Sequence, residues 1–236
     1  MLDLILASYL LVLLPGWQLW KSLKKKEKEN PLDSGMSPER LVRNLVFILT
    51  PLAALAVLMA VTGRAPASLG LDIPVSTYGQ WGLLFVVVLM IVVFVWSAIA
   101  DRKKDQQKKD EEFAELEALG GVPKTGAELR GYVLLSFCLG TGWELLYRGY
   151  LLLVLPPVTG LSGAVILSAL AYGIGHGYKS RNQFIGSIVS AFLFTLAYVW
   201  TRSLWWLMLL HVYLPLLGVL SGYFMLRKRT AQKVAA

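Results

Sequence analysis

Seven long apolar stretches constrain the fold of this 236-residue chain more than any other feature. A helix that crosses the hydrocarbon core of a bilayer needs about 20 mostly apolar residues, at a rise of about 1.5 Å each. Apolar residues make up 56% of the chain, which is more than soluble domains contain. The sequence therefore predicts an all-α fold, an integral membrane helical bundle of about seven transmembrane helices. The stretches are residues 4–20, 42–62, 80–100, 131–155, 161–176, 184–200 and 203–226.

The positions of the basic residues predict how the chain is oriented in the membrane. If the N-terminus is outside and the chain crosses seven times, 20 of the 23 lysines and arginines fall in inside segments. The outside loops then hold only Arg64 and Arg202, and Arg148 lies within a stretch. Lysine and arginine concentrate in the cytoplasmic loops of membrane proteins. We therefore expect a multi-pass protein of the cell (plasma) membrane, with its N-terminus outside and its C-terminus in the cytoplasm.

The charge around the first stretch predicts an uncleaved anchor. Asp3 precedes this stretch and lysines follow it, which is the reverse of the order in a secretory signal peptide. The net charge of +8 is accounted for by the inside loops, and aromatic and basic residues do not alternate as they do in single-strand nucleic-acid binders. We therefore expect membrane lipid as a partner and no nucleic acid.

Residues 101–130 form the longest hydrophilic segment after the first linker. Within it, Asp105 to Leu119 has a helical spacing of Phe113, Leu116 and Leu119, and Gly120–Gly121 would end such a helix. A solvated linker fits the same residues equally well. The pattern leaves both interpretations open.

Four ionisable residues lie within or at the edge of the later apolar stretches. Glu144 is the only acidic residue after position 130, and His176 and His211 are the only histidines of the chain. Charged groups at membrane depth are costly, so they usually face the bundle interior and carry function. Glu144 and Arg148 are four residues apart, which places them on one helix face where they can form an ion pair. The small residues Gly140 and Gly142 precede them on this helix and would allow close approach of a neighbour.

The chemistry of these residues leaves alternatives open. Two histidines and a carboxylate can bind Zn²⁺ or can activate water directly, and their spacing does not decide between the two. Each histidine taken alone could equally be a hydrogen-bonded core residue, and the Glu144–Arg148 ion pair could serve only to hold helices together. A transporter with a Glu–His relay is a further reading, but no pair of corresponding interrupted segments supports it.

Three short motifs resemble those of a known family. Trp143-Glu144-Leu-Leu-Tyr-Arg148-Gly149 resembles the first motif of the CAAX prenyl protease type II family, E-E-x-x-x-R followed by Gly. This group is also called the CAAX protease and bacteriocin-processing (CPBP or Abi) family. Tyr172 to His176 resembles its second motif, F-x-x-x-H, and His211 resembles the histidine of its third, H-x-x-x-N. The motifs occur in the family's order over roughly residues 130–226.

The resemblance implies an intramembrane endopeptidase that hydrolyses a peptide bond near the cytoplasmic membrane face. Its substrate would be a peptide or a lipidated protein. By this resemblance His176 acts at the water, His211 is the oxyanion donor, and Arg148 is the structural counter-ion. Glu144 matches the second Glu of the first motif, which accompanies the arginine, and our hypothesis is that it serves as the catalytic carboxylate. We expect no cofactor. The alternative is a metalloendopeptidase in which Glu144, His176 and His211 bind Zn²⁺.

Two positions depart from the family pattern and support a second interpretation. Trp143 stands where the family has its first Glu, and Pro215 stands where it has Asn. The chain would then be a catalytically impaired family member that acts as a membrane binding or bacteriocin-immunity protein. In either case we expect N-terminal helices and linkers over 1–130, a CAAX-protease-like core over 131–226 and a basic cytoplasmic tail over 227–236. The sequence leaves the oligomeric state open.

Overall fold

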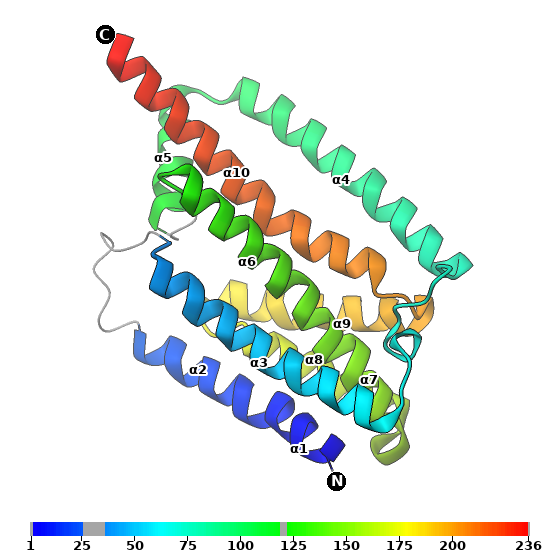
Figure 1. Ribbon diagram of the computed structural model, residues 1–236. Helices are drawn as coiled ribbons and strands as arrows, with labels where there is room; N and C mark the ends of the chain where they lie inside the picture. The colour runs from blue at the N-terminus through cyan, green and yellow to red at the C-terminus, as the bar shows by residue number, and fades with distance from the viewer. Residues whose placement is uncertain (1, 26–35, 119–121, 236) are drawn as a thin grey trace. The chain divides into compact units, whose positions relative to one another are not determined.

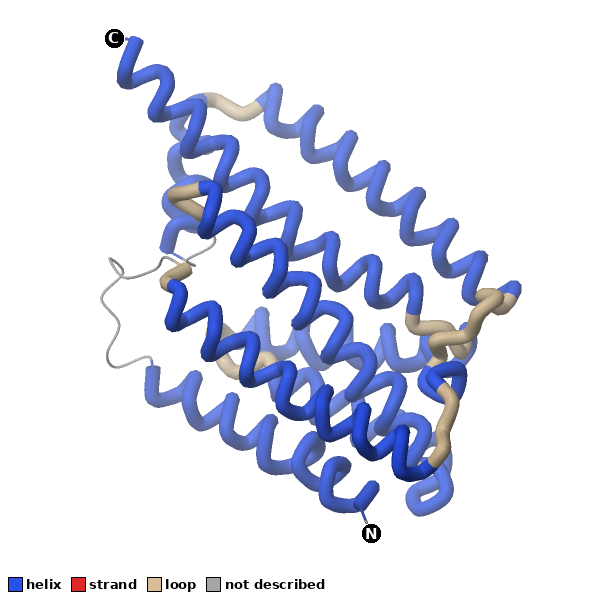
Figure 2. The backbone as a smooth tube through the Cα atoms, in the orientation of Figure 1, coloured by secondary structure: helices blue, strands red, loops and turns tan. Residues whose placement is uncertain are grey.

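The computed structural model describes residues 2–25, 36–118 and 122–235, and these form helices joined by loops (Figures 1 and 2). No strand occurs in these residues, which confirms the all-α prediction. Gly120 and Gly121, expected to end a helix, lie outside the described residues. Among the described residues, the π-helical turns η1 (Tyr9–Leu13) and η4 (Leu145–Tyr150) join α-helices, and the 3-10 turn η3 (Pro66–Leu69) lies in the loop between α3 and α4. The α-helices are α1 (Leu2–Ser8), α2 (Leu14–Lys25), α3 (Pro38–Thr62), α4 (Thr77–Lys103), α5 (Gln106–Ala118), α6 (Gly126–Glu144), α7 (Leu151–Val154), α8 (Pro156–Gly175), α9 (Arg181–Thr201) and α10 (Trp205–Ala235).

Six helical runs among the described residues are long and apolar enough to cross a membrane. The predicted fourth stretch, residues 131–155, is not one of these six. It is helical from Gly126 to Val154, but η4 divides it and it carries Glu144 and Arg148. The chain is therefore a helical membrane protein with six candidate spans and one further helical run with a polar centre. The six spans are Leu2–Lys24, Pro38–Thr62, Thr77–Lys103, Pro156–Gly175, Arg181–Thr201 and Trp205–Gln232.

Helix α5 decides between the two interpretations of the hydrophilic segment after α4. The side chain of Asp105 accepts a hydrogen bond from the Lys108 amide at 2.8 Å, which caps the start of this helix. Phe113 is buried, and the Arg229 guanidinium lies 4.2 Å from the centre of its ring. Arg229 also forms an ion pair with Asp110. The segment is thus a helix that packs against the C-terminal part of α10.

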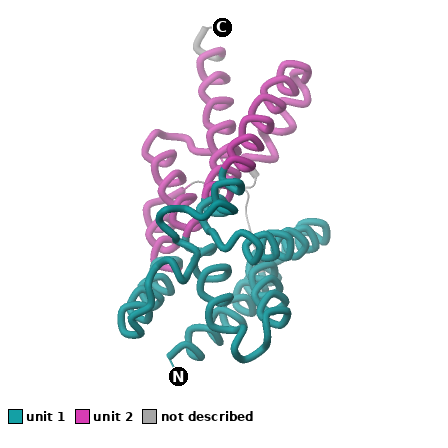
Figure 3. Tube along the Cα trace, turned by 90° about the vertical axis from the view of Figure 1, so that its right-hand side faces the viewer, with its two compact units in different colours: residues 1–29, 48–83, 142–208 teal, residues 30–47, 84–141, 209–236 magenta. Residues whose placement is uncertain are grey.

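The chain forms two compact units (Figure 3). Unit 1 comprises residues 1–29, 48–83 and 142–208, and unit 2 comprises residues 30–47, 84–141 and 209–236. Glu144, Arg148 and His176 belong to unit 1, whereas His211 belongs to unit 2. Helices α3, α4, α6 and α10 contribute residues to both units.

Loop contacts within unit 1 show which helix ends lie on the same side. Arg64, which follows α3, forms an ion pair with Asp3 at the start of α1. At the other end of the first helical run, Ser22 Oγ accepts a hydrogen bond from the Tyr178 amide at 2.7 Å. Asp3 thus lies beside Arg64, and Ser22 lies beside the loop after α8. The charge distribution also places the members of each pair on the same side of the membrane. Which of the two sides faces the cytoplasm stays a prediction.

Candidate active site

The π-helical turn η4 carries most of the first motif. It joins α6 to α7 and buries every residue from Leu146 to Tyr150. A π-helical turn alters the regular backbone hydrogen bonding, and such turns are frequent at functional sites. Here Ser168 Oγ of α8 donates to the Tyr147 carbonyl oxygen at 2.7 Å, and the Tyr147 hydroxyl donates to the Leu10 carbonyl oxygen at 2.9 Å. Leu10 lies in the other π turn, η1, so a side chain forms a hydrogen bond with a backbone carbonyl oxygen of each turn, as backbone groups in a membrane interior require.

Two glycines allow neighbouring segments to approach the helix that carries the motif. A Cβ atom on Gly142 would lie 2.8 Å from Ile48 Cγ1 of α3, and one on Gly149 would lie 3.0 Å from the Leu69 carbonyl oxygen. Both distances are shorter than ordinary side-chain contacts, so any larger residue would require these neighbours to move. The close approach predicted at Gly142 is confirmed.

Glu144 and Arg148 form the predicted ion pair, and both side chains are completely buried. Arg148 Nη1 donates to Glu144 Oε1 at 2.9 Å. Moving two charges out of water is costly, and their mutual attraction offsets that cost only when the geometry is good and further hydrogen bonds are made. A buried cation and anion in contact therefore depend on each other.

Arg148 has three further contacts, which come from two other helices. Its Nε donates to Thr195 Oγ1 of α9 at 3.3 Å, and its Nη2 donates to the Ala191 carbonyl oxygen at 3.4 Å. On α8, the ring of Tyr172 faces the guanidinium, with 3.8 Å between the ring centre and Cζ. A cation above an aromatic face is stabilised by the ring electrons, most strongly where water is excluded. Arg148 thus ties η4 to both α8 and α9.

His176 lies at the C-terminal end of α8, directly beyond this cluster. Its ring stands edge-on to the Tyr172 ring, with 4.6 Å between their centres, and its Nδ1 is 2.9 Å from the Tyr172 carbonyl oxygen. The side chain itself is exposed. Gly177 follows with a φ of 70°, a left-handed conformation that glycine adopts without strain and that ends the helix. His176 is therefore the accessible member of a contact series that begins at the buried Glu144.

His211 lies on α10 in unit 2. A Cβ atom on Gly140 of α6 would be 3.0 Å from the His211 carbonyl carbon, so these two helices are in close contact at that point. This confirms the second predicted close approach. The structure brings Glu144, Arg148 and His176 into one unit, and the role of His211 stays a prediction.

The candidate zinc ligands Glu144 and His176 lie in unit 1, and His211 lies in unit 2. Among the described residues, no group of three or more histidine, cysteine, aspartate or glutamate side chains is placed to hold a metal ion. The metal-binding alternative stays a prediction.

Sequence reasoning did not identify Thr195, Tyr147 or Ser168 as part of the site. Thr195 and Ser168 are completely buried hydroxyl groups within apolar helices. A polar residue at membrane depth is a weak signal by itself, because serine and threonine can bond to their own helix, as Thr195 also does to the Ala191 carbonyl oxygen at 2.7 Å. Tyr147 lies inside the first motif, so its presence near the site could have been expected.

Comparison with known proteins supports the resemblance that the motifs indicate. Residues 126–229 match the family model described as Type II CAAX prenyl endopeptidase Rce1-like. No curated protein and no solved structure matches the chain. The matched region contains all three motifs, so the resemblance to the CAAX prenyl protease family that they indicate is confirmed over residues 126–229.

Proposed function

We propose that this chain is an intramembrane endopeptidase that hydrolyses a peptide bond of a peptide or lipidated protein near the cytoplasmic membrane face. In this proposal the protein lies in the plasma membrane with its N-terminus outside. The exposed His176 at the end of α8 is then on the cytoplasmic side, where a substrate can reach it. The supporting observation is the contact series Glu144–Arg148–Tyr172–His176, which joins the first and second motifs within unit 1.

The proposed reaction needs a base for water and a donor for the oxyanion. Glu144 takes a proton from water, with His176 as its partner at that water, as the water oxygen attacks the carbonyl carbon of the scissile bond and gives a tetrahedral oxyanion. The family resemblance assigns the hydrogen bond to that oxyanion to His211. The C–N bond then breaks, the proton passes to the leaving amine, and the products are a carboxylate and an amine. Arg148 keeps Glu144 in place and does not touch the reacting atoms.

A second candidate function is binding without hydrolysis, as in a family member that has lost activity. The observation that favours it is the burial of Glu144, which has no exposed surface and is bonded to Arg148. Trp143 stands where the family has its first Glu. The centre of its ring lies 6.0 Å from the centre of the Tyr147 ring. A carboxylate in this position has a structural role that does not require contact with water.

Cleavage of a quenched fluorescent prenylated peptide by the purified full-length protein tests the first proposal. We expect cleavage by the wild type and its loss in Glu144→Gln and in His176→Ala. Glu115→Gln is the matched control, because it makes the same chemical change on the exposed side of α5. Addition of a chelator to the wild type tests the metal alternative in the same assay.

The two candidate functions differ in a single outcome. If the wild type binds the prenylated peptide but cleaves neither it nor unmodified peptides, the binding function replaces the endopeptidase. Cleavage that persists in Glu144→Gln at the wild-type rate would remove Glu144 from the reaction and leave His176 as the remaining base of the contact series.

A further inference from the structure

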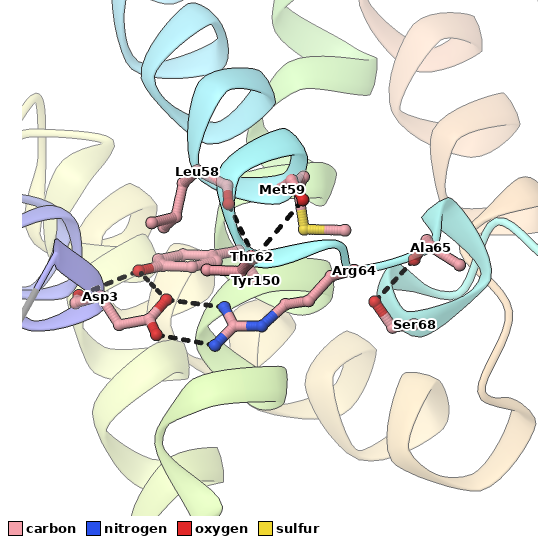
Figure 4. Close-up of polar contacts among 8 residues, drawn as sticks. All are labelled: Asp3, Leu58, Met59, Thr62, Arg64, Ala65, Ser68 and Tyr150. Carbon is pink, nitrogen blue, oxygen red and sulfur yellow. Dashed lines mark hydrogen bonds and ion pairs between the residues drawn. The ribbon is translucent and has the colours of Figure 1, made fainter.

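The first helical run, α1–η1–α2, lies outside the residues that match the family model, yet it is bonded to both parts of the site in unit 1. Figure 4 shows the contact at its N-terminal end. The carboxylate of Asp3 accepts two hydrogen bonds from Arg64, one at each oxygen and both at 2.7 Å. This bidentate geometry is among the strongest that an arginine makes. The bonded Asp3 carboxylate also raises the pKa of Arg64 above its usual value.

Tyr150, the last residue of η4, completes this cluster. Its hydroxyl donates to the Asp3 carbonyl oxygen at 2.9 Å and to Asp3 Oδ1 at 3.2 Å (Figure 4). Tyr150 is two residues after Arg148, so the end of the turn that carries the ion pair is attached to the start of α1.

The middle of the same turn has a second attachment to the first helical run. The Tyr147 hydroxyl donates to the Leu10 carbonyl oxygen within η1. Both tyrosines of η4 therefore donate to backbone carbonyl groups of one neighbouring run, and the two attachments lie on either side of Arg148 along the turn.

The C-terminal part of the run reaches the segment after His176. Ser22 Oγ accepts a hydrogen bond from the Tyr178 amide, and a Cβ atom on Gly177 would lie 3.1 Å from Ser22 Cβ and 3.4 Å from the Gln18 carbonyl oxygen. The first helical run thus contacts η4 at two points and the His176 end of α8 at a third.

We propose that the helical run α1–η1–α2 determines the position of the site residues on η4. Tyr147 and Tyr150 are positioning residues that hold η4, and with it Glu144 and Arg148, against this run. Neither tyrosine takes part in the chemistry. The inference concerns how the turn is held, so it stands whether the site hydrolyses a peptide or only binds one.

Hydrogen–deuterium exchange of the full-length protein in lipid nanodiscs tests this proposal without any activity measurement. Tyr150→Phe and Tyr147→Phe each remove a hydroxyl and leave the ring. We expect amide exchange in peptides covering residues 143–151 to become roughly fivefold to tenfold faster, because a net hydrogen bond contributes on the order of one kcal/mol to a local opening. Exchange in α9 is expected to stay at the wild-type rate.

Tyr213→Phe is the matched control, since its hydroxyl donates to the Met90 carbonyl oxygen at 3.0 Å in unit 2. It deletes the same kind of bond and is expected to leave residues 143–151 unchanged. The proposal is overturned if both unit 1 variants leave exchange in residues 143–151 unchanged, or if they accelerate exchange equally in η4 and α9. The second result would mean a general loss of stability.

Where the wild type cleaves peptide, Tyr150→Phe should lower kcat several-fold with little change in KM, because the turn is misplaced and substrate contacts remain. An inactive wild type would count against the endopeptidase and would leave the exchange result intact. The failure of one proposal can thus be distinguished from the failure of the other.

Discussion

The buried ion pair between Glu144 and Arg148 predicts how substitutions of these two residues change the unfolding free energy. We consider three variants: Glu144→Leu, Arg148→Met and the two together. Each single change removes one charge and leaves the other in a site without solvent exposure. The double change removes both charges and fills the space with apolar side chains of similar length.

The structure predicts unequal losses for the two single changes. Breaking a buried ion pair by removing one partner costs about 3–5 kcal/mol of unfolding free energy. Glu144→Leu should lie near the lower value, because Arg148 keeps its contacts with Thr195, the Ala191 carbonyl oxygen and the Tyr172 ring. Arg148→Met should lie near the upper value, because it removes the cation that is bonded to Glu144 Oε1. The double variant should be more stable than either single variant, because replacing a whole buried pair by apolar groups is often nearly neutral.

Unfolding of the purified protein in mixed micelles, followed by circular dichroism, measures all three variants. The partly exposed ion pair between Lys104 and Glu112 provides the control cycle, since its side chains are 29% and 41% exposed. Breaking that pair should cost no more than about 1 kcal/mol. If the losses of the two buried single variants simply add in the double variant, the two charges do not depend on each other and the reasoning is refuted. Peptide cleavage by a stable double variant would in addition exclude Glu144 from catalysis.

Two further predictions concern packing in unit 1, and a third concerns the orientation in the membrane. Tyr172→Leu should lower the unfolding free energy by about 1–2 kcal/mol, because the ring contact with the Arg148 guanidinium is lost. Tyr172→Phe keeps the ring and should lower it less. A larger loss in Tyr172→Phe than in Tyr172→Leu would show that the ring contact does not stabilise the fold. Gly142→Ala should cost about 1–3 kcal/mol by overpacking, whereas Gly218→Ala, which has open space around it, should not; thermal unfolding compares them. For topology, alkaline phosphatase fused within loop 63–79 should be active, and a fluorescent protein fused to the tail 227–236 should fluoresce in the cytoplasm. The reverse result would invert the orientation.

The local pairing in the first motif could be predicted from the sequence because it follows helical geometry. Residues i and i+4 share a face, so the ion pair between Glu144 and Arg148 follows from their spacing alone. The same holds for the close approaches at Gly140 and Gly142, which only require that a small residue faces a neighbouring helix. The apolar stretches likewise predict the helices, although α10 extends past the predicted end at residue 226 to Ala235.

The long-range contacts could not be predicted, because no periodicity in the sequence encodes them. Asp3 and Tyr150 are separated by 147 positions, and Arg148 and Thr195 by 47. Asp3 contributes to the predicted orientation as a charge at the start of the first stretch, but nothing in its surroundings indicates a bond to a tyrosine of the first motif. The resemblance to the family provides no help either, since the matched residues begin only at 126.

The two π-helical turns explain why these long-range contacts converge on one place. A π turn departs from regular α-helical hydrogen bonding, and in a membrane interior the backbone groups affected need protein partners. Tyr147 is the residue that couples the two turns: its hydroxyl supports the Leu10 carbonyl oxygen in η1, and its own carbonyl oxygen is supported by Ser168. A change that relaxes η1 to a regular helix would move Leu10 and weaken the attachment of η4. The position of Arg148 therefore depends on a helical run at the start of the chain, and loss of function in variants of α1–η1–α2 is expected even though these residues lie outside the three motifs.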